Sequence, residues 1–247
     1  MARTAVSGRL SWQVARLAEV RDETPSARTL VLDVPGWPGH LAGQHADVRL
    51  TAEDGYTAQR SYSLAAPADG ERIELTVQRV EDGEVSSYLT DVFSLGDPVE
   101  VRGPVGGWFV WRPSDPAPVL LIAGGSGIVP LMAMVRARRV AGVRTPFRLL
   151  YSVRSPKELY YADELRAAAL SGVEVSYVYT REAPAGWGRE PGRIGVADVN
   201  TGGWPASFEP ACFVCGPTGF VEDVSDMLLA LGHDPRRVKT ERFGPTG

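Results

Sequence analysis

The segment from Pro116 to Val135 constrains the fold more than any other part of the sequence. It contains no charged residue and is about as long as a membrane-spanning helix. However, Gly124-Gly125-Ser126-Gly127 and Pro130 stand in its middle, where they would break such a helix unless other protein groups satisfied the backbone. The segment instead predicts a buried strand, a glycine turn and a helix in succession.

A proline-rich connector, Arg112–Pro118, separates two halves of different character. Before it, short β-rich runs alternate with turn-forming residues, a pattern typical of an antiparallel barrel or sandwich. One helical stretch, Val85–Phe93, interrupts this half. The six expected strands are Gln13–Arg21, Ala27–Val34, His45–Leu50, Arg60–Leu64, Ile73–Arg79 and Pro98–Arg102.

Beyond the connector, apolar runs alternate with amphipathic stretches, which predicts a parallel α/β sheet covered on both faces. The expected strands are Val119–Ala123, Phe147–Tyr151, Val173–Tyr179 and Ala211–Cys215, and the expected helices are Pro130–Val140, Ala162–Leu170 and Gly219–Leu231. We therefore expect two domains, residues 1–112 and 113–247, each with its own core.

The charge balance argues against nucleic acid as a partner. The chain has 26 basic and 30 acidic residues, for a formal net charge of −4, whereas a nucleic-acid-binding protein would be more basic. The densest basic cluster is Arg136, Arg138 and Arg139. The first residues, Met1–Ala5, begin no apolar stretch of signal-peptide length, so we expect a cytoplasmic protein.

The only two cysteines are Cys212 and Cys215. They are too few for a disulfide scaffold or for the four thiolates of an iron–sulfur cluster. On a strand, residues three apart face opposite sides, so we expect neither a disulfide nor a shared metal, and we place Cys212 in the core. No second ligand pair exists, and the three histidines show no ligand spacing, so no metal site is expected.

The loop Gly124-Gly125-Ser126-Gly127-Ile128-Val129-Pro130 follows the strongest expected strand and opens a helix. Glycines let a backbone approach a ligand closely, while the free N–H groups at a helix start attract a pyrophosphate. The dinucleotide fingerprint is incomplete, since Pro130 replaces its third glycine and no acidic residue follows about 20 positions later. Taken alone, a turn that merely joins strand to helix remains an alternative. A hydrolase elbow is not supported, because Ile128 stands where its last glycine should be.

Two motifs in the first half carry polar groups. In Arg60-Ser61-Tyr62-Ser63, strand alternation places Arg60 and Tyr62 on one face. Alone, this is a half-buried strand with a solvated arginine. The segment 83–89 combines a turn, a helix start and small hydroxyls, which can bind a phosphate. Alone, it is a capped helix with Ser86 or its neighbour as the cap.

Together and in this order, these segments resemble the ferredoxin–NADP reductase family over nearly the whole chain. Its flavin motif Arg-x-Tyr-Ser is similar to Arg60, Tyr62 and Ser63, and its phosphate motif Gly-x-Val-Ser-x-x-Leu is similar to Gly83, Val85, Ser86 and Leu89. Its closing motif resembles Gly103–Phe109 with one inserted residue. Its nucleotide loop, its Cys-Gly-Pro loop and its acidic and aromatic C-terminal residues resemble Gly124–Pro130, Cys215-Gly216-Pro217 and Glu241-Arg242-Phe243.

The resemblance implies a six-stranded flavin-binding β-barrel followed by an α/β nucleotide domain, with FAD rather than FMN meeting the nicotinamide between them. It implies that Arg60 pairs with the flavin phosphates, that Tyr62 packs beside the ring, and that Ser63 lies near flavin N5. The implied catalytic residues are Ser63, Cys215 and Glu241. The implied cofactor-binding residues are Arg60, Ser61, Tyr62, Ser63, Gly83, Val85, Ser86, Gly124, Gly125, Ser126, Gly127, Pro130, Arg154, Thr180, Arg181, Cys215, Gly216 and Pro217.

The choice of nucleotide depends on the ends of two strands. Thr180-Arg181-Glu182 is similar to the Ser-Arg-Glu element with which NADP-using relatives hold the 2′-phosphate. Neither this position nor Arg154-Ser155 offers a carboxylate for a bare ribose diol. We expect NADPH over NADH, with Arg181 as the main discriminator and Arg154 second. NAD stays possible, since Glu182 adds a negative charge and a solvated charge at the strand end is the alternative role for Arg181.

The sequence thus predicts an FAD-dependent NAD(P)H oxidoreductase that passes a hydride from nicotinamide to flavin, and then electrons to a separate acceptor. Ferredoxin, flavodoxin or an oxygenase component fits that role, and the identity of the acceptor, the direction of electron flow in the cell and the oligomeric state stay open. The alternative is a non-catalytic flavin-binding regulatory or assembly subunit. A short-chain dehydrogenase is not supported, because neither Tyr160 nor Tyr161 is followed four residues later by lysine.

Overall fold

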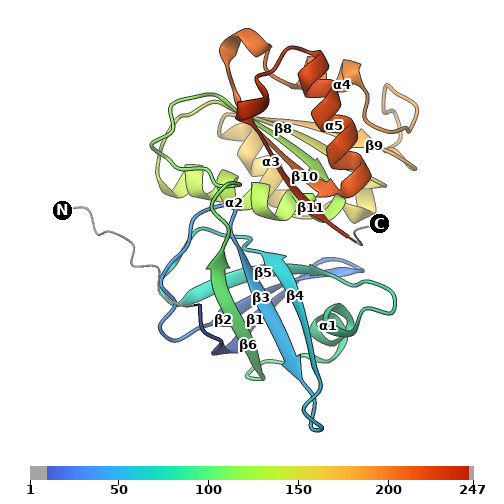
Figure 1. Cartoon of the computed structure of the whole chain (residues 1–247). Coiled ribbons are helices and arrows are strands. Elements are labelled where there is room, and N and C mark those ends of the chain that lie inside the picture. The colour runs from blue at the N-terminus through green and yellow to red at the C-terminus, as the bar shows by residue number, and fades with distance from the viewer. Residues whose placement is uncertain (1–9, 245–247) are drawn as a thin grey trace, which may run out of the picture.

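The computed structural model describes residues 10–244 and contains two sheets, one in each half of the chain (Figure 1). The first has six antiparallel strands in the order β4-β3-β6-β1-β2-β5, and the second has five parallel strands in the order β11-β10-β7-β8-β9. The predicted fold class is confirmed. The boundary between residues 112 and 113 stays a prediction, and Met1–Ala5 lie outside the described residues.

All six strands expected in the first half are present, with ends displaced by a few residues. They are β1 (Gln13–Thr24), β2 (Ala27–Asp33), β3 (His45–Thr51), β4 (Thr57–Ser63), β5 (Arg72–Gln78) and β6 (Pro98–Val105). The expected helical stretch is α1 (Glu84–Ser87) followed by a wider turn, η1 (Tyr88–Val92). The sheet curls into a barrel because its two edge strands meet at a bridge between Leu64 and Leu75.

Strand β5 has one face in the barrel and the other toward the second half of the chain. Ile73, Leu75 and Val77 are buried in the barrel core. The alternating residues Glu74 and Thr76 point outward and form hydrogen bonds with Arg136 of the helix at 128–140 and with Tyr161, which precedes the helix at 162–170. This strand therefore belongs to the barrel and also forms the floor of the domain interface.

The second half alternates strand and helix as expected. Its strands are β7 (Val119–Gly124), β8 (Phe147–Val153), β9 (Val173–Tyr179), β10 (Ala211–Pro217) and β11 (Val238–Phe243). The helices are α2 (Ile128–Val140), α3 (Ala162–Leu170), α4 (Val196–Gly202) and α5 (Thr218–Ala230), with short turns η2 (Gly125–Gly127), η3 (Pro156–Glu158), η4 (Ala206–Phe208) and η5 (Pro235–Arg237). The sequence analysis did not predict α4 or β11. Strand β11 carries no fully buried side chain, because it is the sheet edge, so it lacks the apolar run of an inner strand.

The uncharged segment 116–135 forms the strand, glycine turn and helix that the sequence predicts: β7, η2 and most of α2. Within residues 10–244, no helix is both long enough and apolar enough to cross a membrane.

The cysteines also follow their expected pattern. Cys212 packs on one face of the parallel sheet and Cys215 on the other, and both thiols are free and buried.

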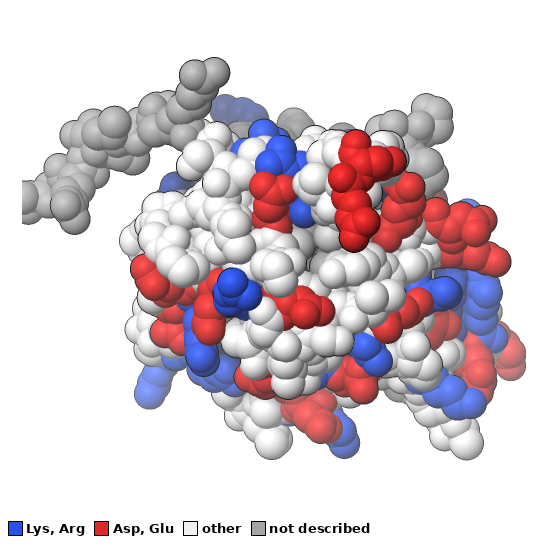
Figure 2. All heavy atoms as spheres, turned by 90° about the horizontal axis from the view of Figure 1, so that it is seen from below, with Lys and Arg blue, Asp and Glu red and all other residues white. Residues whose placement is uncertain are grey.

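The densest arginine cluster is not a basic surface patch. Arg136 and Arg138 are 5% and 8% exposed, so only Arg139 faces solvent. The Arg138 guanidinium donates a hydrogen bond of 2.7 Å to the Thr145 carbonyl. On the lower face of the barrel, basic and acidic side chains are interspersed (Figure 2).

A glycine turn before β3 lets three parts of the chain meet. At Gly43 the φ angle is +100°, and an added Cβ would lie 1.9 Å from the Phe109 carbonyl oxygen and 2.8 Å from the Met134 side chain. The neighbouring Ala42 carbonyl accepts a hydrogen bond from the Trp111 N–H. The barrel, the segment after β6 and helix α2 therefore pack together only because residue 43 has no side chain.

We expect Gly43→Ala to lower the free energy of unfolding by about 3 kcal/mol or more, because backbone strain and overpacking act together. The matched control is Gly55→Ala, which has a φ of +87° but nothing within 4 Å of the added Cβ, and should cost only about 1–2 kcal/mol. Chemical denaturation of both variants measures the difference. Equal losses would contradict the close packing at Gly43.

Candidate active site

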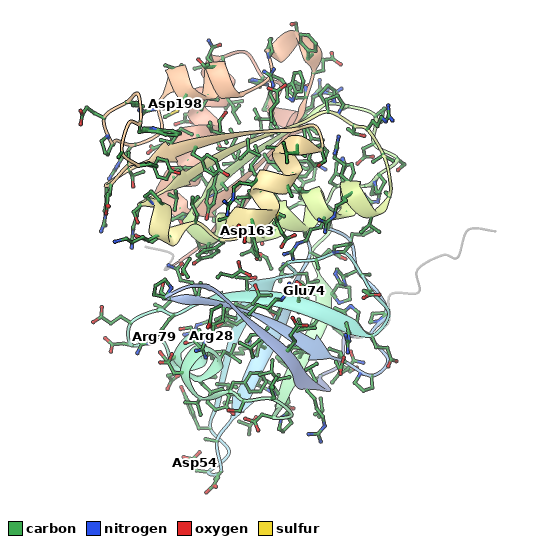
Figure 3. All side chains as sticks on the ribbon, turned by 180° about the vertical axis from the view of Figure 1, so that it is seen from behind. Arg28, Asp54, Glu74, Arg79, Asp163 and Asp198 are labelled. Carbon is green, nitrogen blue, oxygen red and sulfur yellow. The ribbon has the colours of Figure 1, made fainter. Side chains whose placement is uncertain are left out.

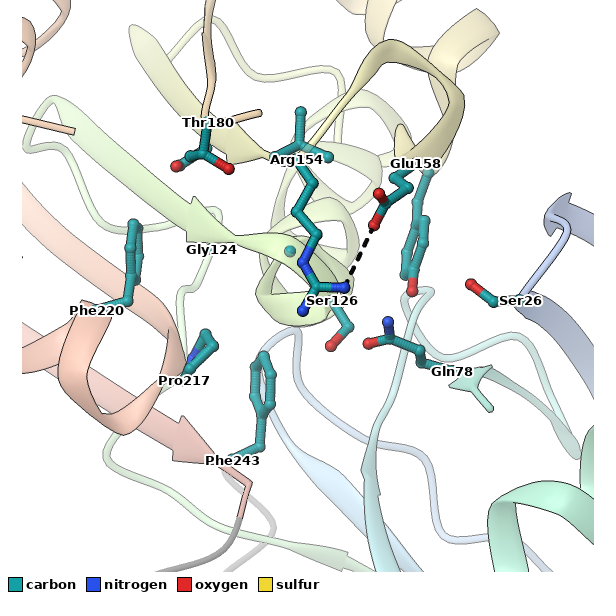
Figure 4. Close-up of a pocket in the computed structure, with 14 residues that line it drawn as sticks. Ser26, Gln78, Gly124, Ser126, Arg154, Glu158, Thr180, Pro217, Phe220 and Phe243 are labelled. Atoms are coloured by element: carbon teal, nitrogen blue, oxygen red, sulfur yellow. Dashed lines mark ion pairs between the residues drawn. The ribbon is translucent and has the colours of Figure 1, made fainter. Parts of the chain in front are cut away.

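The carboxyl ends of β7 and β10 lie side by side at the centre of the parallel sheet. The chain leaves β7 toward β8 on one side, while β10 is followed by β11 on the other, so ligands are expected in the crevice between them. A cavity of about 210 Å³ lies there (Figure 4). Residues from both halves line it: Ser26, Gln78, Gly124, Gly125, Ser126, Ser152, Val153, Arg154, Glu158, Tyr160, Thr180, Pro217, Phe220 and Phe243.

The glycine turn forms one wall of this cavity, and its glycines differ in what surrounds the position of the absent Cβ. A Cβ at Gly127 would lie 2.1 Å from the Cys215 carbonyl oxygen, so this residue lets the start of α2 press against β10. Gly125 has a φ of +55° and nothing within 4 Å of its absent Cβ. The ring of Phe220 lies so close to Gly124 and Gly216 that a Cβ on either would be 2.7 Å from it.

This turn fits a pyrophosphate. It leaves an open cradle beside Gly125 at the start of α2, where backbone N–H groups have no partner within the helix. Pro130 is the third residue of α2, where a missing N–H costs no helical hydrogen bond, so it replaces the fingerprint glycine without disturbing the helix. Gly127 and Pro130 support the turn from behind and do not line the cavity.

The far end of the cavity holds a charge pair. A guanidinium nitrogen of Arg154 lies 3.9 Å from a carboxylate oxygen of Glu158, and Thr180 lies beside them (Figure 4). Arg181 is exposed and does not line the cavity, although its backbone N–H donates to the Arg154 carbonyl. Turn η3 also brings the Glu158 carboxylate to the mouth of β8, a group outside the two strand ends from which nucleotide choice was predicted.

Two residues of the flavin motif, Arg60 and Tyr62, alternate along the edge strand β4. The Arg60 side chain is exposed, and its one hydrogen bond within the described residues goes to the Gln59 carbonyl, so the guanidinium fits a phosphate. Tyr62 packs partly against the barrel core. Burial raises the pKa of its hydroxyl to about 12, so it stays protonated.

Other motif residues have partners within the barrel. The Ser61 hydroxyl donates to Asp47 at 2.6 Å, and Asp47 also pairs with Arg102. Val85 is buried in the barrel core. The expectation that Ser86 or its neighbour caps α1 was wrong, since Gly83 is the cap residue. The Ser86 hydroxyl instead accepts from the Val80 N–H and donates to the Gly83 carbonyl, which closes the turn.

Ser63, Cys215 and Glu241, the implied catalytic residues, meet where the two halves join. The Ser63 hydroxyl donates to a Glu241 carboxylate oxygen at 3.3 Å. Glu241 stands beside Cys215 in the register of β11 and β10. Burial raises the pKa of Glu241 to about 7, against the opposing effect of the Ser63 hydrogen bond, so near neutral pH this carboxyl can take up or release a proton.

Cys215 is a neutral thiol in this arrangement. It is fully buried, and burial, with a further contribution from the Glu241 charge, raises the pKa of the thiol well above its usual value. It packs in the core that includes Phe213 and Ile128, directly behind the cavity wall formed by Gly124 and Pro217. Its chemistry there is that of a small polarisable wall rather than a nucleophile.

Sequence reasoning missed seven residues that line the cavity: Ser26, Gln78, Ser152, Val153, Glu158, Tyr160 and Phe220. Ser26 and Gln78 come from the barrel, so only the packing of the two halves brings them to the glycine turn. The sequence signal for Phe220 is indirect: Gly124 and Gly216 both lack a side chain at the positions that the Phe220 ring packs against. Glu158 and Tyr160 follow β8 closely and carry no motif of their own.

Comparisons with known proteins agree with this geometry. Residues 15–110 match the oxidoreductase FAD-binding domain, and residues 121–226 match the oxidoreductase NAD-binding domain. The chain is 33% identical to ferredoxin--NADP reductase B of Sorangium cellulosum, over 93% of this chain and 96% of that one. It is 32% identical to a Ralstonia ferredoxin--NAD(P)(+) reductase component of naphthalene 1,2-dioxygenase/salicylate 5-hydroxylase systems, over 83% of this chain.

A solved structure is also similar. The crystal structure of the Amycolatopsis cytochrome P450 reductase GcoB superposes with a TM-score of 0.82 and 28% identity, over 99% of this chain and 74% of that one. The chain spans only 61% of the length of the Ralstonia relative.

The fold and the two matches together define a chain with an oxidoreductase FAD-binding domain followed by an oxidoreductase NAD-binding domain. The chain belongs to the ferredoxin–NADP reductase-like family.

The raised pKa of Glu241 is directly measurable. We expect one carboxyl to titrate near pH 7 in ¹³C NMR spectra of the carboxyl-labelled FAD-free protein, and to vanish in Glu241→Gln. Ser63→Ala should raise that pKa further, because the hydroxyl donates to the charged form and stabilises it. If the Glu241 carboxyl titrates near 4.5, or if Ser63→Ala lowers its pKa, the assignment is wrong.

Proposed function

We propose that this protein is an FAD-dependent NAD(P)H oxidoreductase that takes a hydride from the nicotinamide onto the flavin and passes electrons to a separate acceptor. The observation that carries the proposal is the contact between Ser63 and Glu241. Ser63 ends the flavin motif on β4, and Glu241 lies on β11 of the nucleotide domain, next to the cavity. One hydrogen bond therefore marks the place where the two cofactors would meet.

The chain's own residues would bind, orient and hold protons. Flavin and nicotinamide, when bound, supply the hydride chemistry, so the protein's task is orientation. Arg60 binds the flavin phosphates, while Tyr62 packs beside the ring and Ser63 faces its reactive edge. Glu241 takes up or releases a proton near neutral pH. The remaining implied cofactor residues stay predictions.

The nucleotide is held by both walls of the cavity. The turn Gly124–Gly127 and the Gly216-Pro217 end of β10 receive the pyrophosphate and nicotinamide, and Arg154 with Thr180 receives the adenosine end. Cys215 packs behind the nicotinamide. The preference for NADPH stays a prediction, and Arg154 replaces Arg181 as the first residue to test, because Arg154 lines the cavity.

The acceptor is a separate protein in this proposal. The Ralstonia relative is named as a reductase component of oxygenase systems, and the Amycolatopsis structure as a cytochrome P450 reductase. Ferredoxin, flavodoxin and an oxygenase component are the acceptors that we propose, and the cytoplasmic location stays a prediction. The two cysteines of this chain lie on opposite faces of one sheet, so they do not jointly bind a cluster.

Anaerobic reduction tests the function. The purified, FAD-loaded protein should be yellow and should bleach when NADPH or NADH is added, and it should then reduce ferricyanide repeatedly. Each nucleotide is tested separately with the flavin absorbance as the readout. Bound flavin that neither nucleotide bleaches would instead support the alternative, a non-catalytic flavin-binding subunit, and failure to retain FAD would exclude both.

Nucleotide choice is tested by three variants. Arg154→Ala should raise the KM for NADPH about tenfold and leave that for NADH nearly unchanged, since one charge-assisted contact to the 2′-phosphate is lost. Arg181→Ala should have a smaller effect, because this side chain lies outside the cavity. Glu158→Gln should lower the KM for NADPH, because it removes a negative charge facing the phosphate. A wild type that prefers NADH, or equal losses for both nucleotides in Arg154→Ala, would defeat the assignment.

A further inference from the structure

A buried arginine joins the two domains through contacts that do not include Ser63 or Glu241. Arg136 lies on α2 and is 5% exposed. Its guanidinium donates to both carboxylate oxygens of Glu164 on α3, to a carboxylate oxygen of Glu74 on β5 at 3.0 Å, and to the Ala65 carbonyl at 2.9 Å. One side chain thus holds a strand and a loop of the barrel against two helices of the nucleotide domain.

Tyr161 forms the second half of this cluster. Its ring lies against the Arg136 guanidinium, 4.8 Å from centroid to carbon, and its hydroxyl hydrogen-bonds Thr76 of β5. Its backbone N–H donates to a carboxylate oxygen of Glu23 on β1 at 3.0 Å. The φ of Tyr161 is +56°, a region that a bulky residue rarely adopts, so its surroundings hold the backbone in place.

The barrel side of the cluster is itself cross-linked. The Thr29 hydroxyl donates to Glu23 at 2.6 Å and lies 2.7 Å from the Thr76 hydroxyl. Figure 3 shows Glu74 on the strand directly below the nucleotide domain, and Asp163, the neighbour of Glu164, at the start of the helix above it. We call the set Glu23, Thr76, Glu74, Arg136, Tyr161 and Glu164 the interdomain lock.

The lock is continuous with the cavity through the backbone. Gln78 lies two residues after Thr76 on the same face of β5, Ser26 follows Glu23 in the turn after β1, and Tyr160 directly precedes Tyr161. All three residues line the cavity, Ser26 and Gln78 from the barrel and Tyr160 from the nucleotide domain. A shift of the lock would therefore move the barrel wall of the cavity relative to the glycine turn.

Buried ion pairs contribute less to stability than to a defined geometry, because their attraction is offset by the cost of removing charges from water. Apolar packing alone would tolerate sliding of the barrel against α2, whereas the lock fixes donors and acceptors at hydrogen-bond distance. Hydride transfer depends steeply on the distance and alignment of the reacting atoms, so a fixed domain orientation has a direct use.

We propose that the interdomain lock is a positioning device: Arg136 and Tyr161, which lie outside the cavity, set the orientation of the two domains and so the approach of nicotinamide to flavin. The inference rests on the proposed function, because it names the residues that align its two reactants. It assigns Arg136, Tyr161 and Thr76 no contact with either cofactor.

Two conservative variants of the FAD-loaded protein test the lock. Tyr161→Phe removes only the hydroxyl that meets Thr76, and Glu164→Gln keeps the shape while weakening the hold on Arg136. The matched control is Asp163→Asn on the same helix, whose side chain is 92% exposed. The readouts are the rate of flavin reduction at saturating nucleotide, the Kd for the oxidised nucleotide, and amide hydrogen exchange of residues 77–79 and 159–160.

We expect flavin reduction at saturation to slow about tenfold in both variants, with the Kd changed by less than about twofold and faster exchange in both segments. Asp163→Asn should match the wild type in reduction rate, Kd and hydrogen exchange. An unchanged reduction rate, or a loss confined to the Kd, would overturn the proposal, and if Tyr161→Phe does not fold, Glu164→Gln decides. If neither nucleotide reduces the wild type, the proposed function fails, whereas unchanged exchange in the variants refutes the lock itself.

Discussion

The burial of helix α2 on nearly every side is the constraint on which the rest of the structure depends. All of its residues except Arg139 and Val140 are buried, because the parallel sheet covers one side and the barrel covers the other (Figure 1). Its first turn presses against β10 through Gly127, its middle meets the barrel at Gly43 through Met134, and Arg136 reaches β5. The same helix therefore opens the nucleotide cavity and holds the two domains together.

This arrangement separates two electrostatic tasks across one interface. At one contact, Arg136 donates to Glu164, Glu74 and the Ala65 carbonyl. Burial by itself would lower the pKa of Arg136, but hydrogen bonding and the charge of Glu164 outweigh it and raise the pKa, so Arg136 stays a fixed cation. At another contact, Glu241 is half-buried, and within residues 10–244 its carboxylate accepts one side-chain hydrogen bond, from the neutral Ser63 hydroxyl, so its protonation changes near neutral pH. A charged group with several hydrogen-bond partners keeps its charge and fixes the positions of those partners. A charged group with few such partners is able to exchange a proton.

The sequence predicts the two sheets well because buried apolar residues follow a regular pattern along their strands. The run around Gly124 was readable as strand, turn and helix, and the spacing of Cys212 and Cys215 correctly placed them on opposite faces. Strand β11 was missed because an edge strand needs no apolar run, although its Glu241 was singled out by motif. The cavity was only half predictable. Gly124, Arg154 and Thr180 carry local signals, whereas Ser26 and Gln78 reach the site only through domain packing, and Glu158 only through the course of one short turn.

Strand β11 has a further consequence as the edge of its sheet. It pairs with β10 alone, so its backbone is held by a single row of hydrogen bonds, while β10 has neighbours on both sides. Edge elements open locally at a lower free energy than the strands inside a sheet. Glu241 and Phe243 both lie on β11, the first against Ser63 and the second at the cavity wall. Fraying of this one strand would withdraw the proton-exchanging carboxyl and the aromatic wall together, and would expose the flavin side of the interface while both domain cores stay folded.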